Sequence, residues 1–174
     1  SAPVTVEPGE ALIGKDDVVV VSGGGRGVTA ACVVEWARDT GARFVLLGRS
    51  ELVEEPACCV GVHTDADLKR ALLNQAKAAG EKVSPAELGA TVRRLLASRE
   101  VRQTLADVEA AGGSARYRSA SVTDGASIET VLAETRGDWG PISGLVHGAG
   151  VLADRKIAEQ TDDQFDRIFD TKIE

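Results

Sequence analysis

A β-branched run that leads directly into a glycine cluster is the feature that most constrains the fold of this chain. Residues 17–21 read Asp-Val-Val-Val-Val, and the next six residues read Ser-Gly-Gly-Gly-Arg-Gly. A short, uninterrupted apolar run predicts a strand buried on both faces, and such strands belong to parallel sheets. From Gly27 to Thr40 the apolar residues take helical spacing, and Gly41 is a natural helix stop. The chain therefore opens with a strand, a tight glycine loop and a helix.

The same alternation continues along the chain. Residues 43–47, 115–121 and 142–147 are predicted strands, with helical patterns between them. This order predicts an α/β fold, a Rossmann-like doubly wound parallel sheet. Right-handed crossovers place the second and third strands on one side of the first strand and the fourth on the other. We therefore expect a ligand where the first and fourth strands separate.

An extra helical segment follows the second strand. Leu68, Leu72 and Leu73 mark one helix that ends at Gly80. Ser84-Pro85-Ala86-Glu87 then combines a capping box with proline at the first helical position, and the helix it starts keeps its spacing as far as Gly112-Gly113. We expect a helical insertion over about residues 51–103, either as a solvated arm with one packed face or as a docking element for a partner.

Length and the end of the pattern suggest the domain organisation. A chain of 174 residues corresponds to one domain. Residues 1–15 are expected to be a lead-in or linker, and residues 16–174 a Rossmann-type domain. The chain stops at Glu174 inside a helical pattern that begins with a capping box at Thr161 and Gln164. We therefore expect a partial domain, truncated after the fourth strand and the start of its following helix.

Composition excludes several classes of protein. Hydrophobic residues make up 43% and charged residues 27%, which argues against global disorder. No apolar run approaches the roughly 18 residues needed to span a bilayer. The net charge of -7 argues against nucleic acid or a membrane surface as a partner.

The cysteines do not indicate a disulfide framework or a metal site. Their number is three, and an odd number leaves at least one thiol unpaired. Cys32 is predicted to be small buried filler in a helix. Cys58 and Cys59, with His63 as the one nearby histidine, make a poor zinc site. We expect no metal and a reducing, cytoplasmic location.

The glycine loop predicts dinucleotide binding. Glycines there let a phosphate approach the backbone, and the first turn of the following helix offers unpaired N–H groups and the positive end of its dipole. The strand before the loop and the helix after it supply the context that a glycine cluster alone lacks. The alternative is an ordinary glycine-rich turn that binds no ligand. A Walker A loop is excluded, because no Lys-Ser or Lys-Thr pair follows Gly27.

The end of the second strand favours NADP(H) over NAD(H). That strand ends Leu-Leu-Gly-Arg-Ser over residues 46–50 and has no carboxylate to accept hydrogen bonds from a ribose 2′-hydroxyl. Arg49 instead offers a planar fork suited to a 2′-phosphate, and Arg26 in the glycine loop adds a second positive charge. The alternative is that Arg49 is a solvated loop residue.

Three segments taken together resemble a known family. Residues 22–29 look like the T-G-x-x-x-G-x-G loop of short-chain dehydrogenases/reductases, and residues 145–152 look like the strand-four motif of their ketoreductase branch. Residues 164–173 are similar to the helix that follows in those domains. This branch comprises the ketoreductase domains of type I polyketide and polyunsaturated fatty acid synthases. The helical arm ending at residues 99–105 resembles the form found in large multidomain synthases of the polyunsaturated fatty acid or enediyne type. The resemblance covers about residues 17–174, the N-terminal cofactor-binding part of such a domain.

The resemblance implies roles for particular residues. In such a domain the glycine loop holds the pyrophosphate, the residues after strand two hold the 2′-phosphate, and those after strands three and four line the adenosine side. The cofactor-binding residues implied are Ser22, Gly23, Gly25, Arg26, Gly27, Val28, Arg49, Ser50, Ser121, Val122, His147, Gly148, Ala149 and Gly150. Lys172 matches a catalytic lysine that assists a tyrosine in protonating the ketone oxygen; the alternative is an exposed helix lysine.

The sequence departs from the family pattern at several positions. Thr29 replaces the last glycine of the loop, and Ser22 replaces a threonine. Ser121 stands where the family often has an aspartate that contacts the adenine amine. Without that carboxylate, the Val122 backbone is the group expected to make this contact. The family's catalytic serine and its Tyr-x-x-x-Asn motif lie beyond Glu174, and Tyr117, on the third strand, cannot stand in for that tyrosine.

The implied parent is an NADPH-dependent β-ketoacyl reductase. It acts on a carrier-protein thioester, alongside the other domains of a multidomain synthase, and this chain is its cofactor-binding part, expected to be inactive alone. The alternative is a non-catalytic nucleotide-binding or scaffolding module. A serine followed by Tyr-x-x-x-Asn downstream would distinguish the first from the second.

Overall fold

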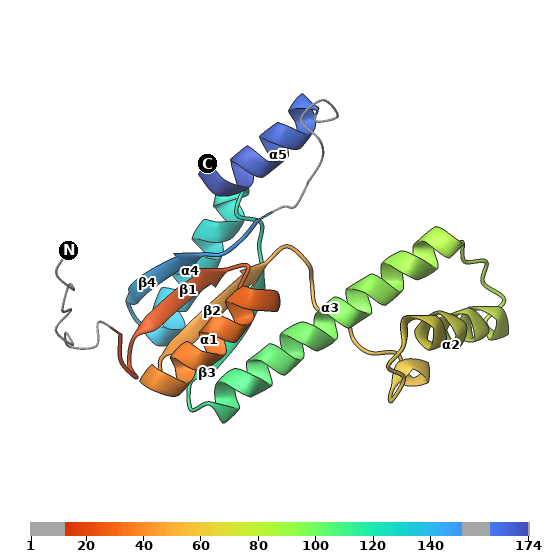
Figure 1. Cartoon of the computed structure of the whole chain (residues 1–174), viewed down its shortest axis with the longest axis horizontal. Helices are drawn as coiled ribbons and strands as arrows, with labels where there is room; N and C mark the ends of the chain where they lie inside the picture. Colours follow the sequence, from red (N-terminus) through yellow and green to blue (C-terminus); the bar gives the residue numbers. More distant parts are fainter. Residues whose placement is uncertain (1–12, 151–160, 174) are drawn as a thin grey trace, which may run out of the picture.

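The computed structural model describes residues 13–150 and 161–173 of the chain. Most of the expected lead-in, residues 1–12, lies outside the described residues. The elements are β1 (Val18–Ser22), α1 (Gly27–Thr40), β2 (Arg43–Gly48), a 3-10 turn at Ala57–Cys59, α2 (Asp65–Ala78), α3 (Pro85–Ala110), β3 (Ser114–Ser119), α4 (Gly125–Trp139), β4 (Ile142–His147) and α5 (Asp162–Ile173), as drawn in Figure 1.

The described strands form one parallel sheet in the order β3-β2-β1-β4. This confirms the predicted Rossmann-like sheet, with β2 and β3 on one side of β1 and β4 on the other. Because all four strands run the same way, their carboxyl ends meet at one edge of the sheet, where the predicted residues that end or directly follow the strands gather.

Helices cover both faces of the sheet, and the alternation of side chains along each strand decides which face they serve. Val19, Val21 and Phe44 pack with α1 and with Val108 of α3, whereas Val18 and Val20 pack toward α4 on the opposite face. The four valines of β1 are each at most 1% exposed. A strand buried on both faces in this way is what the continuous valine run predicts.

Local capping explains where most of the helices begin. Thr64 accepts a hydrogen bond from the Asp67 N–H at the start of α2, and Asp124 accepts one from the Ser127 N–H at the start of α4. Ser84 and Glu87 form the complete capping box predicted for α3. Gly41 ends α1 in the left-handed conformation, as its position in the pattern predicts.

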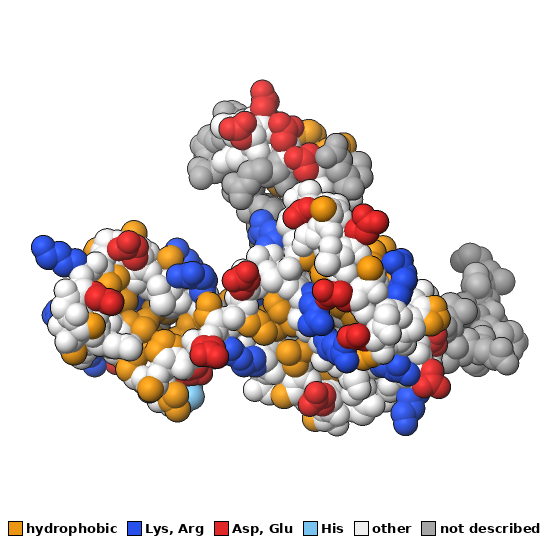
Figure 2. All heavy atoms as spheres, turned by 180° about the vertical axis from the view of Figure 1, so that it is seen from behind, with side chains coloured by type: hydrophobic (Ala, Val, Ile, Leu, Met, Phe, Trp, Pro, Cys, Tyr) orange, Lys and Arg blue, Asp and Glu red, His pale blue; other side chains and the backbone are white. Residues whose placement is uncertain are grey.

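The insertion forms a separate lobe, which we call the arm (residues 51–98). Its N-terminal loop, α2 and the first half of α3 enclose a small core of Cys59, Leu68, Val92 and Leu95. Figures 1 and 2 show the lobe standing away from the sheet, joined to it by α3. With 26 residues α3 is about 39 Å long, so one continuous helix carries the arm and also covers the sheet.

The prediction that Cys32 is buried was wrong. Helix α1 turns Ala30, Val33 and Ala37 toward the sheet, so Cys32 faces outward and is exposed. Val28 shares the outward face and is 82% exposed. Within the described residues, no helix has the length and apolar character that crossing a membrane requires.

Candidate cofactor site

The junction of β1 and β4 is built from backbone. The Gly148 N–H donates to the Ser22 carbonyl oxygen at 2.9 Å, and on the other side of β1 the Gly23 N–H donates to the Leu47 carbonyl oxygen of β2 at 2.8 Å. Gly23 has a φ of +70°, and a Cβ placed there would stand 2.8 Å from the Gly148 backbone. Only glycine fits both requirements, so this position of the loop is fixed by close packing of two chain segments.

A chain of side-chain hydrogen bonds crosses the same junction. The Ala149 N–H donates to the Ser22 hydroxyl at 3.3 Å, and that hydroxyl lies 2.8 Å from Nδ1 of His147. Nε2 of His147 lies 2.9 Å from the Thr171 carbonyl oxygen. Because a carbonyl only accepts, Nε2 carries the hydrogen, and in the neutral ring Nδ1 then accepts from the Ser22 hydroxyl. His147 therefore ties β1, β4 and α5 together.

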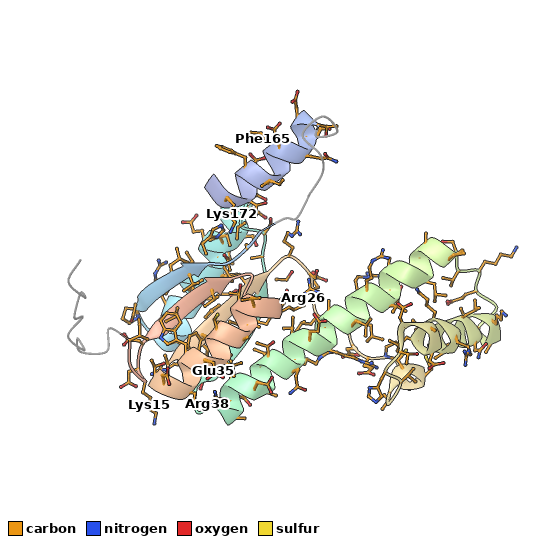
Figure 3. The ribbon with its side chains drawn as sticks, in the orientation of Figure 1. Lys15, Arg26, Glu35, Arg38, Phe165 and Lys172 are labelled. Carbon is orange, nitrogen blue, oxygen red and sulfur yellow. The ribbon has the colours of Figure 1, made fainter. Side chains whose placement is uncertain are left out.

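The hydrogen bond between His147 and the Thr171 carbonyl oxygen brings Lys172 close to the strand-four motif. Lys172 follows Thr171 in the last turn of α5, and its Nζ lies 3.9 Å from the position that a Cβ on Gly150 would occupy. Its side chain is exposed, and Figure 3 shows it above the carboxyl edge of the sheet. An ammonium at this place can stabilise negative charge that develops beside the edge.

A cavity of about 400 Å³ opens beside the glycine loop. The predicted residues Gly23, Gly25, Arg26, Gly27, Arg49 and Ser50 all line it. The opposite wall is the middle of α3, at Ala97, Ser98, Glu100 and Val101. The structure thus places residues from the loop, from the end of β2 and from the insertion around one space.

Tyr117 forms the floor of this cavity. Its ring lies within 3.2 Å of where a Cβ on Gly25 would stand, and its hydroxyl donates to the Ser50 carbonyl oxygen at 2.7 Å. Burial raises the pKa of Tyr117, while the nearby Arg26 charge and the hydrogen bond to Ser50 oppose this rise. The tyrosine is therefore a structural support for the loop that follows β2.

The N-terminus of α1 differs from those of α2, α3 and α4. Those three helices are capped by Thr64, Ser84 and Asp124, whereas within the described residues Arg26 at the N-cap of α1 makes no side-chain capping bond. The first turn of α1 carries no acidic residue, which is also true of α4 but not of α2 or α3. Uncapped N–H groups and a positive dipole end beside a cavity suit a phosphate group.

Charged side chains of both signs surround the cavity. Nη1 of Arg26 lies 3.5 Å from Oε2 of Glu100, across the space between the loop and α3. Figure 3 labels Arg26 in the loop. Arg49 is exposed and has no ion pair within residues 13–150 and 161–173. Glu51 also lines the cavity. Glu100 was missed by the sequence reasoning, because nothing local in α3 indicates that it faces a loop 74 residues away.

Eight of the predicted cofactor-binding residues do not line this cavity. Five of them belong to the junction of β1 and β4 described above, namely Ser22, His147, Gly148, Ala149 and Gly150; the other three are Val28, Ser121 and Val122. The Val28 side chain points to solvent on the outer face of α1. Ser121 and Val122 follow β3 in a turn, where the Ser121 hydroxyl lies 2.9 Å from that of Thr123 and the Ser121 carbonyl accepts from the Asp124 N–H. Both stand at the carboxyl edge, since the Ala120 N–H donates to the Gly48 carbonyl oxygen at 2.9 Å. In the described ranges no cluster of three or more metal-ligating side chains occurs.

The fold and the site define a nucleotide-binding type of α/β protein, and comparison with known proteins gives the family. The family profile described as KR domain matches residues 18–174. The chain belongs to this ketoreductase domain family, which confirms the resemblance drawn from its motifs.

Individual relatives agree with the family. A polyunsaturated fatty acid synthase polypeptide of Thraustochytrium sp. is 41% identical over 98% of this chain, which spans 6% of that protein. A ketoreductase domain from the bacillaene assembly line superposes with a TM-score of 0.62 at 21% identity, over 95% of this chain and 29% of that one. A metagenomic short-chain oxidoreductase in complex with NADP superposes with a TM-score of 0.56 at 17% identity, over 92% of this chain and 51% of that one.

Proposed function

We propose that this chain is the cofactor-binding part of an NADPH-dependent β-ketoacyl-(carrier protein) reductase within a multidomain polyketide or fatty acid synthase. The observation that carries the proposal is the cavity between the uncapped start of α1 and the guanidinium groups of Arg26 and Arg49. NADPH, when bound, would supply the hydride that reduces the β-ketone to a β-hydroxyacyl thioester. The reductase family of the chain and the NADP complex of one structural neighbour support this choice.

The roles of the residues follow from their positions. The glycine loop and the first turn of α1 would hold the pyrophosphate, and Arg49 with Arg26 would hold the 2′-phosphate. Gly148, Ala149 and the other residues of the strand-four motif would border the adenosine, and Lys172 would stabilise negative charge on the ketone oxygen.

The expected partners are the carrier protein that brings the β-ketoacyl group and the other synthase domains, as in the multidomain synthase relative. A reducing, cytoplasmic compartment belongs to the proposal and agrees with the three free thiols Cys32, Cys58 and Cys59.

Calorimetric titration of the purified chain with NADPH and with NADH tests the cofactor assignment. We expect NADPH to bind at least tenfold more tightly, and Arg49→Gln to remove about tenfold of that affinity with little change for NADH. Arg38→Gln is the matched control, because Arg38 pairs with Glu35 at the far end of α1 (Figure 3). Equal binding of the two nucleotides by the wild-type chain would refute the NADP assignment.

The alternative, a non-catalytic nucleotide-binding or scaffolding module, makes a different prediction for the parent protein. A reductase parent oxidises NADPH in the presence of a β-ketoacyl thioester, and Lys172→Ala lowers kcat about a hundredfold with little change in NADPH affinity. A parent that binds NADPH without ever oxidising it would instead be a binding module.

A further inference from the structure

The cavity beside the glycine loop holds as many carboxylates as guanidinium groups among its described lining residues. Arg26 and Arg49 face it, but so do Glu51 and Glu100. Two arginines in an acidic chain are expected to require an anion, and for Arg26 part of this requirement is already met by Glu100. The bound nucleotide therefore meets a guanidinium group that has a competing partner.

Glu100 cannot easily leave this position, because α3 is fastened to the glycine loop on the next turn of the helix. The buried hydroxyl of Thr104 lies 3.0 Å from the Gly25 carbonyl oxygen and 3.0 Å from the carbonyl oxygen of Glu100 itself. Val101 packs against the same loop, within 3.1 Å of where a Cβ on Gly25 would stand. The backbone of Glu100 is thus held against the loop that carries Arg26.

We propose that Glu100 is a specificity-determining residue whose carboxylate competes with the nucleotide 2′-phosphate for the Arg26 guanidinium and thereby narrows the preference for NADP(H) over NAD(H). This inference rests on the proposed function, since it concerns the same cofactor site. To bind the phosphate through Arg26, the chain must give up the ion pair with Glu100 and bring two negative groups close together.

The effect is specific to the phosphorylated cofactor. NADH carries a hydroxyl where NADPH carries the phosphate, and a carboxylate accepts a hydrogen bond from a hydroxyl. Arg26 and Glu100 have side chains that are 55% and 61% exposed, so water screens their interaction and the expected effect is moderate. Removing the charge of Glu100 should strengthen NADPH binding by about threefold to tenfold and leave NADH binding unchanged or slightly weaker.

The experiment is a calorimetric titration of the whole chain with NADPH and with NADH, in low salt and again in about 0.3 M salt. The variants are Glu100→Gln, Arg26→Gln and the double variant, and Glu35→Gln is the control. Glu35 pairs with Arg38 on the far part of α1, so this control changes the net charge equally without touching the cavity. Glutamine keeps both the size and the helix propensity of glutamate, and circular dichroism verifies that each variant is folded.

Two results together support the inference. First, Glu100→Gln raises the ratio of NADPH affinity to NADH affinity, more in low salt than in high salt. Second, this rise disappears in the Arg26→Gln background. The control Glu35→Gln leaves the ratio unchanged. The inference would be overturned if Glu100→Gln left the ratio of NADPH affinity to NADH affinity unchanged. It would also be overturned if Glu100→Gln raised this ratio by the same factor in the Arg26→Gln background. A wild-type chain that binds neither nucleotide would overturn the proposed function and, with it, this inference; binding of NADPH with no effect of Glu100 would overturn the inference alone.

Discussion

The two parts of the candidate site are built in different ways. At the junction of β1 and β4, backbone groups and small residues meet in close contact, with Gly23 against Gly148 and the Ser22 hydroxyl between Ala149 and His147. At the cavity beside the loop, Arg26 of the glycine loop pairs with Glu100 of α3 across open space, and Arg49 and Glu51 from the end of β2 also line it. Under the proposed function, the first part would fix where a nucleotide lies, and the second part would decide which nucleotide is preferred.

The two parts should also differ in the effects of substitutions. A close-packed backbone junction has no room for an added atom, so changes there act on folding. Exposed charged side chains can be exchanged at little cost to stability, so changes at the cavity act on affinity. Substitutions in the junction, in the arm and at the tie to α5 can therefore test the comparison one region at a time.

The largest expected effect is at the junction. Gly23→Ala forces an L-residue into a φ of +70° and places its Cβ 2.8 Å from the Gly148 backbone, so we expect a loss of about 3–5 kcal/mol in the free energy of unfolding. Gly27 has a φ of +66° but no neighbour within 4 Å, so Gly27→Ala should cost only about 1–2 kcal/mol. Urea denaturation of both variants measures the difference, and equal losses would show that packing at the junction is unimportant.

The junction was predictable from sequence, whereas the wall of the cavity was not. A valine run, a glycine cluster and the helix after it are local signals, and they predicted β1, α1 and the order of the sheet. The strand-four motif at residues 145–150 was equally local. Glu100 is different: its place at the cavity depends on how α3 crosses the glycine loop, and the sequence of α3 shows only helical spacing. The prediction that Cys32 is buried was wrong for a similar reason, since helical spacing alone does not tell which side of α1 meets the sheet.

The arm should respond to loss of one arginine as an independent unit. Arg99 of α3 donates to the Val62 carbonyl oxygen at 2.6 Å and the Cys59 carbonyl oxygen at 2.7 Å, and it pairs with Glu55. Arg99→Met leaves these groups without their charged donor, so we expect the arm to lose about 2–4 kcal/mol of local stability. Hydrogen exchange should show faster exchange over residues 53–62 and unchanged protection in β1.

The exposed Arg94 on the same helix provides the control for this arm variant. Arg94→Met should change stability by no more than about 0.5 kcal/mol. If Arg99→Met also lowered protection in β1, the arm and the sheet would unfold as one cooperative unit, and the arm could not be treated as independent of the sheet.

A smaller effect is expected where His147 ties the sheet to α5. His147→Phe keeps the volume of the ring but removes its hydrogen bonds to Ser22 and to the Thr171 carbonyl oxygen. We expect a loss of about 1–2 kcal/mol, seen as faster hydrogen exchange in α5 with little change in β2. His63→Phe is the control, because His63 is exposed in the arm. Equal protection of α5 in both variants would mean that His147 does not hold this helix.

At neutral pH the smallest effect concerns the buried thiol in the core of the arm, because it acts only in alkaline solution. Burial, together with the neighbouring Cys58, raises the pKa of Cys59 from about 9 to about 11. Between these values the unfolded chain has lost the thiol proton while the folded chain keeps it, so the folded state binds more protons and stability falls as pH rises through this window. Relative to Cys59→Ala, the wild-type chain should therefore lose stability between about pH 9 and pH 11, and a thiol reagent at about pH 8 should label the exposed Cys32 well before Cys59. Burial also raises the pKa of Tyr117, but this tyrosine is present in both chains, so its contribution cancels in the comparison. Rapid labelling of Cys59 would show that the arm opens readily, and its core would then be far less stable than the sheet that carries it.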